Sequence, residues 1–333
     1  MDRRRRIGAY GLCRDGERVL LARGSGACPF PGYWQLPGGG VEHGEHPTAA
    51  LLREFREETG LTVEVVALRA AVADVVRLAG PDGPVAEHTD RIIYDVAVAD
   101  GAAVAGDSGP AADGADLAAG ADPVGAGGLP DVADPAGGTD AVAWFTPAEL
   151  VGLPLMPFTA ELLGRPVNPL PEGGPPPVDA GTSPAPVDRH QRFAAYGLAT
   201  DPAGRVLLTL IAEGYPGAGR WHLPGGGTDH GEQPASGLLR ELVEETGQLG
   251  RVTDLVHVSH RYSPTEYGPE GRPLDWHGVR VVYRIVVDAP TEAKVTEAAG
   301  GSTADVAWFT LADARALPAT TEVVAEVLPL LAG

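Results

Sequence analysis

The sequence predicts two copies of one α/β (α+β) domain joined by a linker. Three observations support this fold class. The length of 333 residues suits about two domains of roughly 150 residues each. A set of motifs occurs twice, and short apolar strand patterns alternate with helix patterns in both halves of the chain.

The duplication is carried by motifs that recur 187 residues apart. The heptapeptide WQLPGGG at 34–40 returns as WHLPGGG at 221–227. The tetrapeptide EETG at 57–60 returns unchanged at 244–247. The pentapeptide VAWFT also occurs once near the end of each copy. Two copies of one domain are the simplest explanation.

The spacing between the motifs gives the domain limits. We expect a first domain at 1–163, a Pro-rich linker at 164–189 and a second domain at 190–333. The first copy carries an Ala-, Gly- and Asp-rich insertion at about 99–133 without apolar periodicity, so we expect a disordered surface loop there. Proline density predicts a semi-rigid linker.

Within each repeat the elements follow from local patterns. Pro47 stands at the first turn of a predicted helix and Gly60 ends it. In the first repeat we expect a hairpin strand at 19–22, a glycine turn at 37–40, a helix at 47–59, strands at 63–68 and 91–98, and a last helix that starts at 147–150. The second repeat is expected to place strands at 206–209, 252–258 and 279–287, and a last helix at 311–331.

Composition restricts the partners. The chain has 25 Lys and Arg against 45 Asp and Glu, a net charge of 25 − 45 = −20, which argues against nucleic acid and anionic membranes. Two cysteines make no disulfide framework, and no apolar run is long enough to span a membrane. We expect a cytoplasmic protein that acts on small molecules, and the sequence leaves its oligomeric state open.

Three carboxylates share one face of the first predicted helix. Glu54, Glu57 and Glu58 are spaced i, i+3, i+4, where like charges repel each other. A solvated helix face is the ordinary explanation of such a charge run. However, the same pattern recurs 187 residues later with the same neighbours. Clustered carboxylates suit hard divalent cations, above all Mg²⁺.

This motif resembles the Nudix box, Gly-x5-Glu-x7-Arg-Glu-U-x-Glu-Glu-x-Gly-U, in which U is a bulky apolar residue. The first copy has every specified glycine and charged residue: Gly39, Glu45, Arg53, Glu54, Glu57, Glu58 and Gly60. The second copy matches with Gly226, Glu232, Arg240, Glu241, Glu244, Glu245 and Gly247. Phe55 is a mild departure, and Gln248 stands where an apolar residue is expected.

The resemblance implies a Nudix-fold α/β/α sandwich with a mixed central sheet in each repeat. It also implies Mg²⁺-dependent hydrolysis of the diphosphate linkage in nucleoside diphosphate-X compounds by metal-activated water, with Mn²⁺ as the alternative ion. The implied metal ligands are the Gly38 carbonyl, Glu54, Glu57 and Glu58, and in the second copy Gly225, Glu241, Glu244 and Glu245. Arg53 and Arg240 are implied to orient glutamates, while Glu45, Glu232 and the glycines Gly39, Gly60, Gly226 and Gly247 support the box.

The general base is left open. In some family members it is the first glutamate of the helix motif, here Glu54 or Glu241. In others it is an acid on a later loop, for which Glu297 and, in the first copy, Asp134 are the candidates. An ordinary acidic loop is the competing explanation.

Four histidines accompany the box. His88 and His277 stand at the start of matching strands, where a structural role is favoured over a substrate contact. His43 and His230 lie between the box glycine and glutamate, and we expect them to be solvated.

Three functions remain open: a tandem hydrolase with two competent sites, one catalytic domain with a nucleotide-binding or regulatory domain, and a nucleotide-sensing module without turnover. The second rests on Gln248. The substrate could be an oxidised nucleoside triphosphate, ADP-ribose, a dinucleotide or a nucleotide sugar. The segment 259–276 is richer in aromatic residues than its counterpart, which predicts a base or sugar pocket in the second copy and different substrate preferences for the two domains.

Overall fold

The computed structural model describes residues 1–99, 138–175, 188–267, 273–296 and 301–331. Most of the predicted insertion at 99–133 and the middle of the predicted linker at 164–189 lie outside these ranges. Both therefore stay predictions, as do the domain limits.

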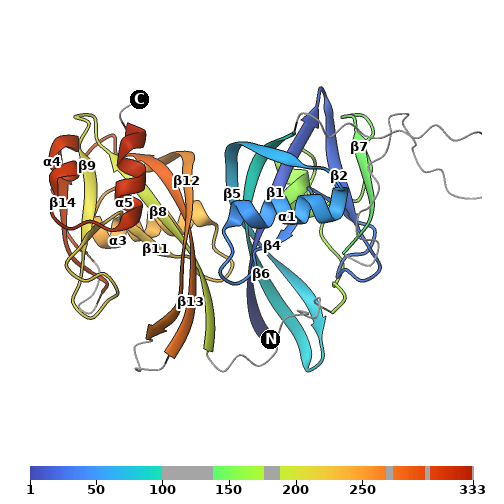
Figure 1. The fold of residues 1–333 in the computed structure, drawn as a ribbon, viewed down its shortest axis with the longest axis horizontal. Coiled ribbons are helices and arrows are strands. Elements are labelled where there is room, and N and C mark those ends of the chain that lie inside the picture. Colours follow the sequence, from blue (N-terminus) through green and yellow to red (C-terminus); the bar gives the residue numbers. More distant parts are fainter. Residues whose placement is uncertain (100–137, 176–187, 268–272, 297–300, 332–333) are drawn as a thin grey trace, which may run out of the picture.

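The first repeat forms a mixed seven-stranded sheet with the strand order β3-β2-β1-β6-β5, in which β4 also pairs with β1 and β7 with β2 (Figure 1). The central pair, β1 and β6, is parallel, and its neighbours are antiparallel. The elements are β1 (Asp2–Asp15), β2 (Arg18–Gly24), β3 (Trp34–Gln35), β4 (Gly38–Gly40), α1 (Pro47–Thr59), β5 (Val63–Gly80), β6 (Gly83–Val98), β7 (Thr139–Phe145) and α2 (Pro157–Leu162).

The second repeat has the same topology, with the order β10-β9-β8-β13-β12, β11 on β8 and β14 on β9. Its elements are β8 (Asp188–Thr200), β9 (Val206–Ile211), β10 (Trp221–His222), β11 (Gly225–Gly227), α3 (Pro234–Thr246), β12 (Arg251–Tyr267), β13 (Pro273–Val286), β14 (Thr303–Phe309), α4 (Leu311–Ala316), α5 (Glu322–Val327) and a 3₁₀ turn (Leu328–Leu331). The predicted duplication and the mixed sheet are confirmed.

Helices cover both faces of each sheet. Successive side chains of a strand point to opposite faces. In β1, Ala9 joins the apolar cluster that contains Phe55 of α1, whereas Tyr10 joins the cluster that contains Phe158 of α2. In the second repeat α3 and α5 contribute to different clusters in the same way. Each described repeat is thus a three-layer sandwich, as the resemblance implied.

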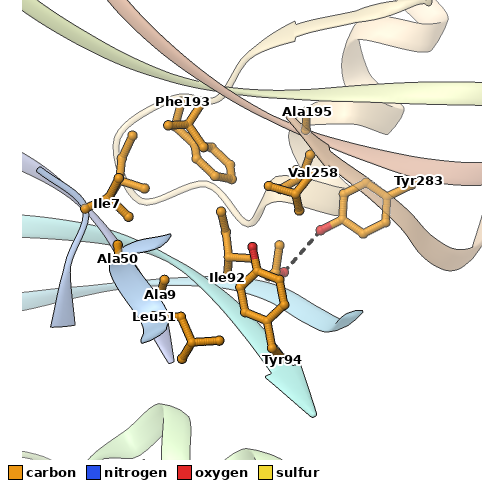
Figure 2. Packing of buried hydrophobic residues seen from close by; sticks show 14 of the residues in the cluster. Ile7, Ala9, Ala50, Leu51, Ile92, Tyr94, Phe193, Ala195, Val258 and Tyr283 are labelled. Carbon is orange, nitrogen blue, oxygen red and sulfur yellow. Dashed lines mark hydrogen bonds between the residues drawn. The ribbon is translucent and has the colours of Figure 1, made fainter. Parts of the chain in front are cut away.

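The two repeats share one apolar core. Figure 1 shows them side by side, with β5 of the first near β12 of the second. Phe193 and Val258 of the second repeat belong to the same cluster of buried side chains as Ile7 and Ile92 of the first (Figure 2). The Tyr283 hydroxyl crosses the junction and donates to the backbone carbonyl of Ala71 at 3.2 Å. The domains are therefore packed against each other through side chains that exclude water.

Two of the predicted helices are wrong in extent. Residues 147–150 start like a helix, with Glu149 accepting from the Thr146 backbone amide at 2.8 Å, but they form a single turn because Gly152 turns the chain with φ +82°. The region 311–331 is not one helix but three short pieces, since Pro318 disfavours helical geometry in the residue before it. Within the described ranges, the structure contains no helix with the length and apolar character needed to cross a membrane.

Candidate active site

The box helices of the two repeats begin and end at equivalent residues. α1 begins at Pro47, whose fixed φ suits the first turn, and α3 begins at Pro234. Gly60 and Gly247 end them in the left-handed conformation, with φ +69° and +68°. The glutamates thus occupy matching positions on both helices.

Arg53 is the centre of the first site. Its Nε and Nη2 donate to the two oxygens of Glu45 at 3.0 and 2.9 Å, and Nη2 also donates to the Gly40 carbonyl at 3.0 Å. Its Nη1 donates to Glu54 at 2.9 Å and to Glu57 at 3.3 Å. One rigid guanidinium therefore ties the turn that precedes α1 to two carboxylates on α1.

The second site repeats this arrangement. Arg240 donates to both oxygens of Glu232 at 3.1 Å, to Glu241 at 2.9 Å and to Glu244 at 3.2 Å. Its bond to the Gly227 carbonyl is longer, at 3.5 Å. The five hydrogen bonds go to four residues that correspond in kind and order, so both copies of the box adopt one geometry.

The remaining glutamate of each box faces the sheet. Glu58 accepts from the Gly38 backbone amide at 2.9 Å and from the Thr139 hydroxyl at 2.6 Å. Glu245, only 4% exposed, accepts from Gly225 at 2.8 Å and from Thr303 at 2.6 Å. These bonds fix the glutamate beside the glycine whose carbonyl the resemblance places in the metal site.

Two threonines of the sites were not predicted from the sequence. Thr139 and Thr303 each stand five residues before the tryptophan of the repeated VAWF motif. That shared spacing was a signal that could have located them. Their strands, β7 and β14, each pair with the hairpin strand of their own repeat and so bring the hydroxyl to the box helix.

In the first site, burial raises the pKa values of the carboxylates, and nearby positive charge lowers them. Burial raises the pKa of Glu58 to about 7 and also raises the pKa of Glu54 above its ordinary value. Burial is also the largest single cause at Glu45, but hydrogen bonds from Arg53 and from the Glu42 backbone amide, together with the nearby positive charge of Arg53, hold that pKa below its ordinary value. In the second site the hydrogen bond from Arg240 is the main cause of the lowered pKa of Glu232.

The donor set fits a divalent cation in its chemistry. Four carboxylates, Glu45, Glu54, Glu57 and Glu58, face two guanidinium groups, Arg6 and Arg53, so full ionisation leaves a charge of about −4 + 2 = −2. One divalent cation balances this charge. Arg53 uses one oxygen each of Glu54 and Glu57, and a carboxylate can accept at both oxygens.

The described carboxylates do not have the spacing of a metal-binding site in this structure. Among the described residues, no three His, Cys, Asp or Glu side chains are arranged to hold a metal ion. The side chains of the α1 glutamates instead bond to Arg53 and Thr139. Small rotamer changes of the glutamates would therefore have to accompany ion binding.

A cavity of about 320 Å³ opens in front of the first box. Its walls carry Glu54, Glu57 and Glu58 together with Arg6 and Arg91. Aromatic side chains complete the lining: Tyr10, Phe30 and Tyr33. Carboxylates, guanidinium groups and aromatic faces in one cavity suit a ligand that has phosphates at one end and a flat apolar group at the other.

Gln248, the departure from the box pattern, is accommodated locally. The side chain is 1% exposed and exchanges hydrogen bonds of 2.9 Å with the hydroxyl and the amide of Thr291. A buried amide with both ends bonded carries little penalty. The carboxylate geometry on α3 remains equivalent to that on α1.

The four histidines that accompany the box meet in two pairs across the contact between the repeats. His88 and His277 are fully buried, so the structural interpretation is confirmed. The expectation that His43 and His230 are solvated is wrong, because each packs against a histidine of the other repeat, with ring centroids 5.5 Å apart for His43–His277 and 5.4 Å apart for His230–His88.

The aromatic segment of the second copy faces the first repeat. The Tyr262 ring lies 3.3 Å from the position of a Cβ on Gly44, which belongs to the box turn of the first repeat. Trp276 stacks on His190 with an interplanar angle of 10°. The loop acids Glu297 and Asp134 lie outside the described residues.

The NUDIX domain model matches both repeats, at residues 2–116 and 190–331. The chain therefore belongs to the Nudix family. It is 43% identical over 72 residues to "Nucleoside triphosphatase NudI" of Enterobacter sp. (strain 638), a match that covers 21% of this chain and 45% of that protein. It is 36% identical over 74 residues to "8-oxo-dGTP diphosphatase" of Proteus vulgaris, covering 22% of this chain and 66% of that protein. The matches thus span about half to two thirds of these relatives.

Solved structures of the family are also similar. The MutT protein from Methanosarcina mazei Go1 is 18% identical with a TM-score of 0.35, and the match covers 44% of this chain and 95% of that one. The NUDIX domain of Shewanella oneidensis NrtR, complexed with ADP ribose, is 22% identical with a TM-score of 0.34, covering 43% and 89%.

Proposed function

We propose that the chain is a tandem hydrolase whose two domains each cleave the diphosphate linkage of a nucleoside diphosphate derivative, with Mg²⁺ or Mn²⁺ as cofactor. The observation that carries the proposal is the repeated arginine–glutamate geometry. The bonds from Arg53 to Glu54 and from Arg240 to Glu241 are both 2.9 Å long, and those to Glu57 and Glu244 are 3.3 and 3.2 Å long.

In the first domain the Gly38 carbonyl, Glu54, Glu57 and Glu58 would hold the cation. Gly225, Glu241, Glu244 and Glu245 would hold it in the second. When bound, the ion supplies charge neutralisation at the phosphates and lowers the pKa of a water. Arg53 keeps two of the carboxylates in place, and Arg6 and Arg91 on the cavity wall favour the substrate anion.

The reaction transfers a phosphoryl group to water. The oxygen of water forms a bond to phosphorus, the bond from phosphorus to the bridging oxygen breaks, and the leaving phosphate keeps the electron pair. A carboxylate takes the proton of the water. Glu54 and Glu241 are the candidates for this role on the box helices, and Glu297 is the loop candidate.

A small nucleotide derivative is the favoured substrate class. The relatives' names refer to nucleoside triphosphates and 8-oxo-dGTP, and one structural neighbour is a complex with ADP ribose. The charge of −20 disfavours a nucleic-acid partner. The cavity of about 320 Å³ is at the lower end of the range for small-molecule sites.

The alternative in which the second domain is not catalytic has less support. It rested on Gln248, whose side chain is satisfied by Thr291 without any change to the glutamates of α3. A nucleotide-sensing module without turnover also has less support, because both boxes keep the full set of charged partners.

The test is turnover of a nucleotide panel that includes an oxidised nucleoside triphosphate, ADP-ribose, a dinucleotide and a nucleotide sugar. The wild-type chain with Mg²⁺ is compared with the double variant Glu57→Gln/Glu244→Gln, which preserves side-chain size and removes one carboxylate per site. We expect release of a nucleotide product by the wild type and a loss of at least 1,000-fold in the double variant. Equal turnover by both proteins would contradict the proposal.

A further inference from the structure

The turn that precedes α3 is held by the first repeat. This turn, residues 228–233, follows the triple glycine of the second box and contains Glu232, the partner of Arg240. Arg5 of β1 donates to the Thr228 carbonyl and hydroxyl. The Gln233 side chain exchanges two hydrogen bonds with the backbone of Ala73 in β5. Both ends of the turn are thus attached to the other domain.

His88 holds the middle of the same turn. The Gly231 amide donates to His88 Nδ1 at 2.7 Å, and His88 Nε2 lies 3.1 Å from Asp90 Oδ1. Since Nδ1 accepts, the hydrogen of the neutral ring is assigned to Nε2 and is donated to Asp90. Both His88 and Asp90 are fully buried, and Arg5 Nε bonds the second oxygen of Asp90 at 2.7 Å. The acceptor is therefore fixed in place by a buried network.

The contact is one residue away from the box. Gly231 adjoins Glu232, whose two oxygens position Arg240, and Arg240 in turn positions Glu241 and Glu244. Gly231 has φ +90°, a conformation that the turn requires and that glycine adopts without strain. Displacement of this amide would shift Glu232 and, through Arg240, the two carboxylates.

The first box turn is held reciprocally by the second repeat. Gln191, which corresponds to Arg5 at an offset of 186, donates to the Val41 carbonyl at 3.2 Å. Gln191 also lies 3.1 Å from His277 Nδ1, so the histidine that corresponds to His88 binds a side chain instead of the turn amide. The reciprocal contact is present, but of the two corresponding histidines His88 accepts from a turn amide whereas His277 is paired with Gln191.

We propose that His88 of the first domain is a positioning residue for the active site of the second domain, acting through the Gly231 amide and Glu232. Its effect on turnover rests on the proposed function, whereas its effect on the turn does not. The two domains accordingly form one structural unit with two catalytic sites, in which each box turn is held by contacts with the other domain.

Two variants of similar size separate the roles of the two ring nitrogens. His88→Asn places an amide oxygen near the position of Nδ1 and keeps the acceptor for Gly231. His88→Gln reaches towards Asp90 at the position of Nε2 and leaves Gly231 without its acceptor. Hydrogen exchange of the peptide that contains 228–233 is measured first, and we expect at least tenfold faster exchange in His88→Gln than in the wild type or in His88→Asn.

Turnover is then measured at each site separately. The Glu57→Gln background reports the second site and the Glu244→Gln background reports the first. We expect His88→Gln to lower kcat of the second site at least tenfold with a smaller change in KM, and to alter the first site less than threefold although His88 belongs to the first domain. His88→Asn should restore most of the lost kcat.

Unchanged exchange at 228–233 in His88→Gln would overturn the proposal, and so would equal losses at the two sites. If neither background turns over any nucleotide, the proposed function fails, while the exchange comparison still decides whether His88 holds the turn.

Discussion

Replacing Gly39 with alanine tests how closely the glycine turn and the box helix must approach. A Cβ on Gly39 would lie 2.4 Å from Oε2 of Glu54, whereas a Cβ on Gly226 would lie 3.1 Å from Cδ and 3.2 Å from Oε1 of Glu241. Ordinary contact begins at 3.4 Å, so Glu54 would have to move about 1 Å and Glu241 about 0.3 Å. Gly39 and Gly226 therefore form a matched pair in which an added Cβ displaces the neighbouring glutamate by different distances.

The size of the effect follows from these displacements. A misplacement of about 1 Å in a catalytic constellation costs about 100-fold in rate. A shift of about 0.3 Å stays within the tolerance of about 0.5 Å for a productive geometry, so we expect a loss below tenfold. A displacement of Glu54 also disturbs its 2.9 Å hydrogen bond from Arg53.

The assay compares kcat/KM of Gly39→Ala in the Glu244→Gln background with Gly226→Ala in the Glu57→Gln background. Thermal unfolding of each variant serves as the control for folding. Full activity of Gly39→Ala, or equal losses in the two variants, would refute the reasoning about close approach.

Three further predictions concern stability. Thr139→Val removes a 2.6 Å bond to the buried Glu58, and urea unfolding should show a loss of about 1–3 kcal/mol, with no loss if that bond is unimportant. Burial lowers the pKa of His277 to about 4, below the unfolded value of 6.5, so stability is fully present above pH 6.5 and should fall by about 1–3 kcal/mol as the pH drops towards 4. A His277→Gln variant should lose less over this range, and an equal loss would exclude His277 as the cause. Tyr283→Phe removes the bond to Ala71 and should lower the free energy of unfolding by about 1 kcal/mol, whereas an unchanged value would show that the bond contributes nothing.

The sequence was sufficient for the box and for much of the fold. Pro47 and Gly60 set the limits of α1 because their backbone preferences are local. Strands were found but were predicted too short: β5 continues from Val63 to Gly80, well beyond the predicted 63–68. The residues beyond 68 belong to the strand because they pair with β6 as far as Gly80, and Leu78 near the far end is fully buried in the apolar cluster that also contains Phe158.

The interface between the domains could not be predicted from local patterns. His43 and His230 were expected to be solvated because they stand in polar turns. Each is covered by a histidine of the other repeat, and that contact depends on the packing of two sheets and not on neighbours along the chain. Thr139 was missed for a related reason, since only the pairing of β7 with β2 brings it to Glu58.

The central claim, that both boxes are competent, is tested most directly by additivity of rates. Turnover of the best substrate is measured at saturating Mg²⁺ for the wild type, for Glu57→Gln and for Glu244→Gln. Two independent catalytic sites predict that each single variant keeps a measurable rate and that the two rates add up to that of the wild type. A single variant that is as inactive as the double variant, beside another that keeps the full rate, would contradict the claim.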